Sequence, residues 1–329
     1  MGNRVALGLA FLVLISAPSV VLADGYNFQT VVNPSDPAFT QTLGINNAGT
    51  VVGYFGDGVV VPNNGFTVTP PSYTVFTSEN FPGSAETQVI GINGTGGTAG
   101  FYIDTIGNTH GFTLIAGTFT TVDVPGTALN QLLGINNSGE VAGYSQNSPN
   151  AQVPFTELGD AFTILDGLLP SHTSAQATDV NNSGAVSGFF VDNKGMTHGF
   201  LLIGSTETTL DFPGSQSTQA LGLNNDGQVV GEYTDGSGNM HGFLYTIATG
   251  THTEINDPLG VNTTTINGIN DSSALVGFYV DTVGNTDGFV ATATPVATPE
   301  PATGALILLG LGIVFLMRKR IGQRLPQAS

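Results

Sequence analysis

Residues 133–144 read LGINNSGEVAGY, and variants of this stretch recur through most of the chain. Close copies begin at residues 43 (LGINNAGTVVGY), 90 (IGINGTGGTAGF) and 221 (LGLNNDGQVVGE), and weaker copies begin at residues 178 (TDVNNSGAVSGF) and 267 (NGINDSSALVGF). The equivalent asparagines of the six copies are Asn46, Asn93, Asn136, Asn181, Asn224 and Asn270. Neighbouring asparagines are 43 to 47 residues apart, a period typical of armadillo-type helical pairs or of four-stranded propeller blades.

The residue types of the repeat favour strands over helices. Gly, Thr, Val and Asn fill these segments in place of good helix formers. Leu43 and Ile45 alternate around Gly44, which is the period of a strand, and Asn-Asn-x-Gly then supplies the residues of a tight hairpin. Further strands are predicted at residues 51–55, 110–114 and 118–122. Four short strands per repeat make one blade of a β-propeller.

The count of strands predicts a closed ring. The sixth repeat ends at residue 290 and has no fourth strand, whereas residues 27–34 (NFQTVVNP) resemble the fourth strand at 118–125 (TFTTVDVP). A closed ring lets the amino-terminal strand complete the last blade and removes exposed sheet edges. The sequence therefore predicts an all-β, six-bladed β-propeller over residues 24–290, built from four-stranded repeats of about 45 residues.

The amino terminus has the features of a secretory signal. Residues 1–23 combine Arg4, an apolar core over 5–15 and small residues before a predicted cleavage between Ala23 and Asp24. Because the exported chain has no cysteine, its stability must come from packing and not from disulfides.

The predicted exported part is strongly acidic. The whole chain has a net charge of −18, and residues 24–298 contain 23 Asp and Glu against one basic residue, Lys194. Such a surface repels nucleic acid and anionic membranes, so nucleic acid is not expected as a partner.

The composition changes at the carboxyl end. Residues 291–298 form a Thr/Ala/Pro linker, and residues 302–317 contain no charge. As a helix this run spans about 24 Å, slightly less than a hydrocarbon core of about 30 Å. The basic residues that follow predict a cytoplasmic end, hence a single-pass inner-membrane precursor, and are Arg318, Lys319 and Arg320. Residues 321–329 form a short tail.

Residues 299–320 resemble the PEP-CTERM sorting signal of Gram-negative bacteria. The three parts of that signal occur in order: Pro299-Glu300-Pro301, an apolar helix and a basic cluster. The resemblance implies processing near these prolines by exosortase, after signal peptidase has acted at the other end. It also implies a mature protein at the cell surface or outside the cell, linked with exopolysaccharide or biofilm matrix.

The repeats resemble the HAF family of extracellular repeats, which combines a His-Ala-Phe motif with a Gly-Ile-Asn-x-x-Gly pattern. The motif reads His-Gly-Phe at His110, His198 and His241, and the resemblance covers most of residues 44–290. The family has no established catalytic residues to transfer to this chain.

The three histidines are the most obvious candidates for a metal site. Zinc needs ligands about 2.0–2.1 Å from one point, whereas equivalent positions of neighbouring sheets are about 10 Å apart. We therefore expect structural roles for His110, His198 and His241, and for the repeat asparagines, with no metal or cofactor. The Asn-rich hairpins also lack the bidentate Glu of a calcium loop.

Two classes of function remain. The first is a non-enzymatic surface or matrix protein whose ring binds carbohydrate or another protein. The second is a propeller glycosidase or lyase that acts on extracellular polysaccharide through two carboxylates. Repetition without a distinctive polar constellation favours the first class, and no catalytic residue is predicted.

Overall fold

The computed structural model describes residues 20–23, 25–148, 151–260 and 262–294. The chain forms two compact units, Met1–Ala293 and Thr294–Ser329. The predicted membrane helix, the basic cluster and the Pro-Glu-Pro sequence lie outside the described residues, as does most of the predicted signal peptide. Among the residues that are described, no helix is long and apolar enough to cross a membrane.

Almost all regular structure is β, in five sheets. Three sheets have four strands: β3 (Thr40–Ile45), β4 (Val51–Phe55), β5 (Asn64–Val68) and β6 (Phe76–Ser78); β15 (His172–Val180), β16 (Val186–Asp192), β17 (Thr197–Ile203) and β18 (Thr206–Thr209); β19 (Ser217–Leu223), β20 (Gln228–Thr234), β21 (Met240–Thr246) and β22 (Thr251–Ile255). One sheet has eight strands: β7 (Glu86–Ile92), β8 (Thr98–Ile103), β9 (Thr109–Ile115), β10 (Thr118–Val122), β11 (Leu129–Ile135), β12 (Val141–Gln146), β13 (Gln152–Leu158) and β14 (Ala161–Ile164). The fifth sheet contains β1 (Val20–Ala23), β2 (Tyr26–Val31), β25 (Thr286–Ala293), β24 (Leu275–Val280) and β23 (Thr265–Ile269), and a single 3-10 turn, η1 (Asp166–Leu168), follows β14.

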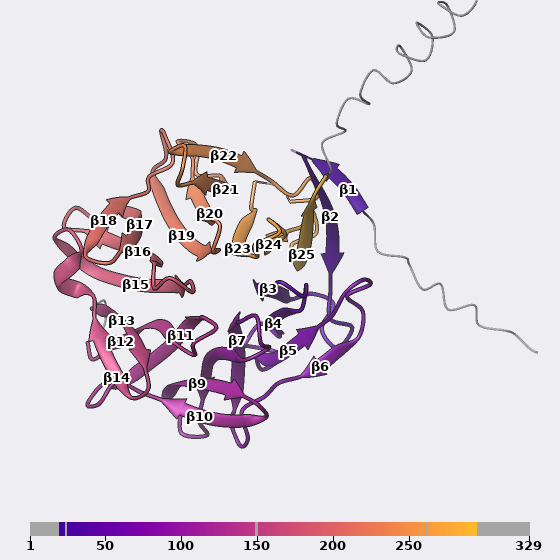
Figure 1. Ribbon diagram of the computed structural model, residues 1–329. Helices are drawn as coiled ribbons and strands as arrows, with labels where there is room; N and C mark the ends of the chain where they lie inside the picture. Colours follow the sequence, from indigo (N-terminus) through magenta and orange to yellow (C-terminus); the bar gives the residue numbers. More distant parts are fainter. Residues whose placement is uncertain (1–19, 24, 149–150, 261, 295–329) are drawn as a thin grey trace, which may run out of the picture. The chain divides into compact units, whose positions relative to one another are not determined.

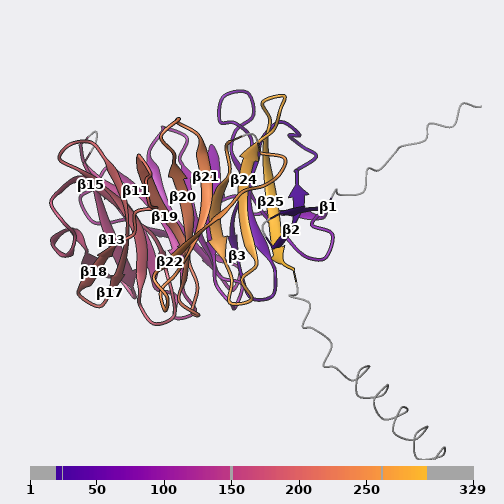
Figure 2. The same cartoon turned by 90° about the horizontal axis from the view of Figure 1, so that it is seen from above.

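The sheets are arranged radially around a central axis, with the first strand of each repeat innermost (Figure 1). Seen from the side, the strands run roughly along that axis (Figure 2). The all-β prediction and the propeller arrangement are confirmed. The prediction of six blades, each a four-stranded sheet, is wrong for the sheets as they form, because β7 to β14 belong to one sheet of eight strands. Its two antiparallel halves are joined by one parallel pair, Leu129 with Thr109, where β11 starts beside β9.

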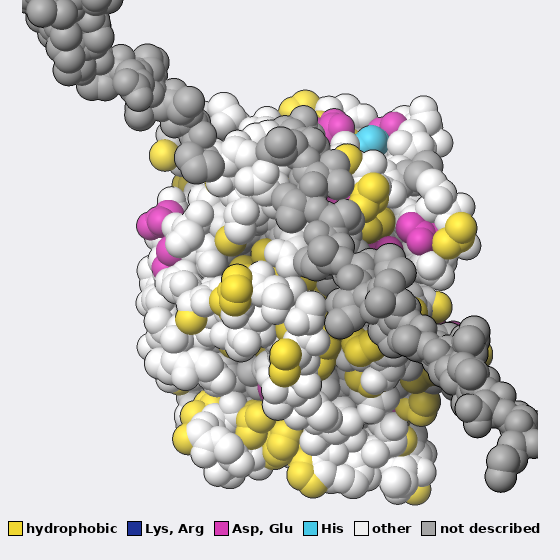
Figure 3. All heavy atoms as spheres, turned by 90° about the vertical axis from the view of Figure 1, so that its right-hand side faces the viewer, with side chains coloured by type: hydrophobic (Ala, Val, Ile, Leu, Met, Phe, Trp, Pro, Cys, Tyr) yellow, Lys and Arg dark blue, Asp and Glu magenta, His cyan; other side chains and the backbone are white. Residues whose placement is uncertain are grey.

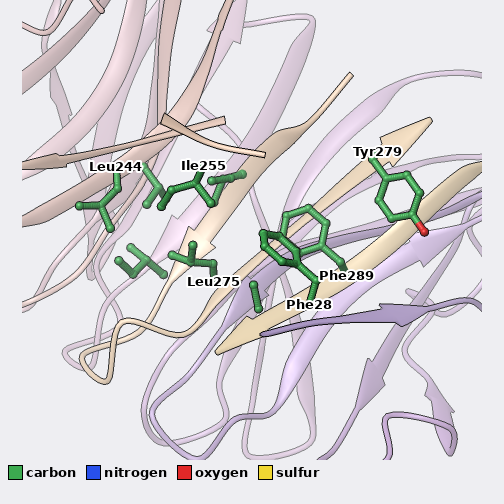
Figure 4. Close-up of a cluster of buried hydrophobic side chains, with 10 residues drawn as sticks. Phe28, Leu244, Ile255, Leu275, Tyr279 and Phe289 are labelled. Carbon is green, nitrogen blue, oxygen red and sulfur yellow. The ribbon is translucent and has the colours of Figure 1, made fainter. Parts of the chain in front are cut away.

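The amino-terminal strand closes the ring. β2 pairs antiparallel with β25 over six residues, from Tyr26 opposite Ala293 to Val31 opposite Gly288. Phe28 is 2% exposed and its ring centroid lies 5.3 Å from that of Phe289. Figure 4 shows both rings in one buried cluster with Leu244 and Ile255 of the neighbouring sheet. The pairing of β2 agrees with the strand count, whereas β1, antiparallel to β2 at the outer edge, was not predicted.

Each repeat packs its third strand through one phenylalanine. The sequence places this ring directly after a glycine in five repeats and after Pro154 in the third, and alternation along the strand turns it into the space between neighbouring sheets. All six of these residues are at most 1% exposed: Phe66, Phe112, Phe155, Phe200, Phe243 and Phe289. Burial of these large aromatic side chains adds to the stability of a chain that has no cysteine and hence no disulfide.

Candidate functional site

The six repeat asparagines form a closed hydrogen-bonded ring around the axis. In the hairpin after β11, Asn136 Oδ1 accepts from the backbone N–H groups of Ser138 and Glu140 at 2.9 and 3.0 Å. Its Nδ2 donates to the carbonyl of Asn181 in the next repeat at 3.1 Å. The same donation runs in sequence from Asn46 to Asn93, Asn136, Asn181, Asn224, Asn270 and back to Asn46. These residues therefore cap their own hairpins and also tie each repeat to its neighbour.

A second layer of hydrogen bonds lies beside this ring. In five of the six repeats, the residue after the repeat asparagine offers its backbone N–H to the side chain of the equivalent residue in the next repeat, as Asn137 does to Asn182 Oδ1 at 2.9 Å. The first repeat lacks this bond, because its neighbour has Gly94 at the equivalent position. The two layers surround a small polar cavity of about 80 Å³ at this end of the axis. Sequence analysis assigned these asparagines only a turn role, because the inter-repeat bonds depend on closure of the ring.

Above the asparagines, the innermost strands approach one another closely at a level of glycines. A Cβ on Gly91 would lie 3.0 Å from the Cα of Gly134, and a Cβ on Gly268 would lie 2.8 Å from the carbonyl oxygen of Leu43. Only glycine permits this backbone approach. The fourth repeat is the exception, because it has Asp179 at this position.

Beyond the glycine level the axis widens into a chamber of about 300 Å³. Five of the six innermost strands contribute a half-buried glutamine to its wall: Gln41, Gln88, Gln131, Gln176 and Gln219. On the adjacent strand, the residue paired with a glutamine is aromatic in four repeats: Tyr54, Phe101, Tyr144 and Phe189. We refer to these five glutamines and to Tyr54, Phe101 and Phe189, which also line the chamber, as the glutamine mouth.

Neighbouring groups hold several of the glutamine amides in place. Tyr144 donates its hydroxyl to Gln131 Oε1 at 2.7 Å, and Gln88 Nε2 donates to Asn63 Oδ1 at 2.7 Å. An amide has two acceptor lone pairs and two N–H donors, so each glutamine keeps bonding capacity for a ligand. In the sixth repeat Thr265 takes the glutamine position, and its hydroxyl donates to Glu232 at 2.5 Å. Burial raises the pKa of Glu232, although the Thr265 hydroxyl opposes that rise.

Asp179 is the one acidic residue among those that line the chamber. Its Oδ2 accepts from the Leu223 N–H at 3.0 Å and its Oδ1 from the Val180 N–H at 2.8 Å. Removal of the carboxyl from water raises the pKa of Asp179 to about 7, against the lowering effect of these two donors.

The three histidines lie at the outer part of the ring, each between acidic side chains. His110 Nδ1 is 2.6 Å from Asp123 Oδ2, and its Nε2 is 3.6 Å from Asp104 Oδ2. His198 lies in the same way between Asp211 and Asp192, and His241 between Glu254 and Asp235. Each ring also stacks on an aromatic residue of the second strand: Tyr102, Phe190 or Tyr233.

These contacts have clear electrostatic effects in the second repeat. The N–H of Asn108 is the main cause that lowers the pKa of Asp104, to about 2. Desolvation lowers the pKa of His110, but Asp123 and Asp104 together raise it on balance. Within the described ranges, no group of three or more His, Asp and Glu is arranged to hold a metal ion. On the face drawn in Figure 3, Asp and Glu are visible and no Lys or Arg is seen.

The glutamine mouth was missed in the sequence, although a signal for it was present. Each of the five glutamines lies five residues before the repeat asparagine of its own copy. The spacing is regular, but a polar residue on a predicted strand gives no indication that it faces a central channel. The residues predicted for sorting and for signal cleavage, Pro299, Glu300, Pro301, Arg318, Lys319, Arg320 and Asp24, lie outside the described residues. Ala23 is the last residue of β1.

Comparison with known families finds the PEP-CTERM protein-sorting motif at residues 297–321. The match includes the Pro-Glu-Pro sequence and the basic cluster. It indicates an exported protein with a membrane-anchored precursor that is sorted to the cell surface. The match does not extend over the repeats, so their resemblance to the HAF family stays a prediction. No curated protein matches the sequence.

Solved structures are similar to this chain at low sequence identity. TolB from Acinetobacter baumannii matches with 10% identity and a TM-score of 0.50, covering 74% of this chain and 63% of that chain. A fucose-specific lectin from Aleuria aurantia has 11% identity and a TM-score of 0.47, with 79% and 96% of the two chains covered. A prolyl endopeptidase structure has 11% identity and a TM-score of 0.43, with 83% and 44% covered. At these identities the similarity concerns the fold alone.

Proposed function

We propose that this chain is an exported, non-enzymatic surface or matrix protein, sorted by exosortase, that binds extracellular carbohydrate through the glutamine mouth. The observation that carries the proposal is the chamber of about 300 Å³ on the axis, with amides and aromatic rings on its wall. Its volume is at the lower end of the range for small-ligand pockets. Amides donate to and accept from hydroxyl groups, and aromatic faces pack against the apolar faces of sugar rings.

The charge of the mouth supports an uncharged or cationic ligand over an anionic one. Asp179 is the only acid among the chamber-lining residues, and no Lys, Arg or His lies among them. An anion would also be repelled by the acidic surface, since the chain has a net charge of −18. The alternative partner is another surface protein. In that case the chain should bind an intact protein and should bind no sugar.

We also propose that the ring works as six blades. On this count, β7 to β10 and β11 to β14 act as two blades in spite of the parallel pair that links them. The support is the asparagine ring, which has six donors and six acceptors and returns to its start. The same six asparagines and the histidines His110, His198 and His241 then have structural roles. No cofactor is needed for this function.

The sorting part of the proposal assigns roles at the carboxyl end. Pro299 and Pro301 hold the chain extended and present Glu300 to exosortase just outside the bilayer, because proline disfavours helix in itself and in the residue before it. Arg318, Lys319 and Arg320 keep the other end of the helix in the cytoplasm. Signal peptidase would separate Ala23 from Asp24, which would also remove β1 from the mature ring.

Mass spectrometry of the exported protein tests the sorting proposal. We expect the mature ring to lack residue 329 and to end near Glu300, and we expect Glu300→Ala to retain the precursor in the membrane fraction. Recovery of an intact carboxyl terminus, with no effect of Glu300→Ala on localisation, would favour an ordinary membrane anchor.

A panel of glycans tests the binding proposal and separates it from catalysis. The exported protein should bind at least one neutral or amine-containing oligosaccharide and leave it intact on long incubation. The double variant Gln88→Ala, Gln131→Ala should weaken that binding by about tenfold or more, since each lost hydrogen bond contributes about 0.5–1.5 kcal/mol. Release of shorter oligosaccharides would instead support the glycosidase or lyase alternative.

A further inference from the structure

The innermost strands repeat one another closely, and two of them depart from the pattern inside the channel. The residue two positions after each glutamine is Leu or Ile in four repeats, namely Leu43, Ile90, Leu133 and Leu221. The fourth repeat has Thr178 there, followed by Asp179 in place of the glycine, and the sixth has Asn267. Thr178 and Asp179 both bond to the fifth repeat, through the Ala220 carbonyl and the Leu223 N–H. Asp179 and Asn267 also line the chamber, where their remaining acceptors can meet a ligand.

Asn267 has an unused acceptor in this wall. Its Oδ1 is buried and has no hydrogen-bond partner among the described residues. Buried polar atoms of folded proteins are almost always hydrogen-bonded, so an exception needs an explanation, and a bound group is one. The group that satisfies Oδ1 must be a donor.

Asp179 provides a charged acceptor in the same chamber. Each of its carboxylate oxygens accepts one backbone N–H, from Leu223 or Val180, and keeps a lone pair. β19 lies against both β15 and β23 and has Gly222 at the level of Asp179, so it adds no side chain at that level. No cationic side chain lines the chamber, and the carboxylate has no counter-charge there.

We propose that the channel binds a protonated primary amine, which donates to the Asp179 carboxylate and to Asn267 Oδ1. An ammonium group has three donors and no acceptor, so it matches the two acceptors at this point of the wall, the Asp179 carboxylate and Asn267 Oδ1. The inference rests on the proposed carbohydrate function for the rest of the ligand: an amino sugar of an extracellular glycan, with its hydroxyls on the glutamines. Acetylation of that amine removes the charge and adds bulk, so the acetylated sugar should bind more weakly beside Asp179 and Asn267.

Titration calorimetry of the exported protein with three probes tests the inference: the glucosamine tetramer, the N-acetylglucosamine tetramer and ethylamine. We expect the glucosamine tetramer to bind at least tenfold more tightly than its acetylated counterpart. Asp179→Asn and Asp179→Gly should each remove that preference, and Asp179→Gly restores the residue of the other repeats. Asn267→Leu should weaken amine binding through a different residue, and Asp226→Asn, an exposed hairpin carboxyl, should leave it unchanged.

The outcomes separate this inference from the proposed function. Equal affinity for both tetramers, or an amine preference that persists in both Asp179 variants, would overturn the inference and leave carbohydrate binding intact. Failure of both ethylamine and the glucosamine tetramer to bind would also overturn it. Binding of ethylamine that depends on Asp179, without binding of any oligosaccharide, would support amine recognition and contradict the carbohydrate function.

Discussion

Asn136 combines two tasks in one side chain. It is 5% exposed, its Oδ1 accepts two N–H groups of its own hairpin, and its Nδ2 donates to the next repeat. Asn136→Ala removes these three bonds and the bond from Nδ2 to Glu140 Oε2, so the free energy of unfolding should fall by about 2–4 kcal/mol. Denaturant unfolding measures this loss. Asn193→Ala is the control, because that exposed side chain makes one hydrogen bond, to Ser171. An equally large loss of unfolding free energy in Asn193→Ala would contradict the special role of Asn136.

Asp179 should make stability depend on pH. Its folded-state pKa is about 7, above the usual value of 3.8, so the folded protein keeps a proton that the unfolded chain has lost between about pH 4 and pH 7. Stability from this group therefore falls as pH rises through that window. The free energy of unfolding of Asp179→Gly, minus that of the wild type, should therefore be larger at pH 8 than at pH 5. A difference that is the same at both pH values would contradict the raised pKa.

At the scale of elements, the closing strand carries a large share of the stability. β2 fills the outer edge of β25 and buries Phe28 against Phe289. Phe28→Ala should cost about 3–5 kcal/mol, and deletion of residues 26–31 should expose a sheet edge and cause aggregation. Melting temperature and light scattering measure both effects, with Val59→Ala, which is 88% exposed, as the control. An unchanged melting temperature after the deletion would contradict closure by β2.

The strands were predictable from sequence, and their lateral contacts were not. Residues 51–55 and 118–122, predicted as strands from alternation and turn residues, are β4 and β10. The position of β2 was also predictable, because the sequence itself shows that the sixth repeat has no fourth strand and that an extra strand stands at the amino terminus. The parallel pair that joins β9 and β11 arises from the position of whole repeats, and no local pattern encodes it. For the same reason the glutamine mouth and the isolated acceptor of Asn267 became visible only with the ring closed.

At the scale of the whole molecule, the ring has one axial chamber and several similar positions at its periphery. Repetition provides similar outer positions in several repeats, such as the His–Asp pairs at His110 and His198, and a pocket of about 250 Å³ lies beside His198 and Asp211. A ligand bound at such positions would occupy several equivalent sites. The axis occurs once, and its polar exceptions, Asp179 and Asn267, occur once each.

The number of ligands bound per ring is therefore the most direct test of the central claim. It can be measured by calorimetric titration of the monodisperse exported protein with the best oligosaccharide of the panel. We predict one ligand per ring, with affinity lost in the Gln88→Ala, Gln131→Ala variant and kept in His198→Ala. Three or more equivalent ligands per ring, with affinity lost in His198→Ala, would contradict it and move binding to the outer surface of the repeats.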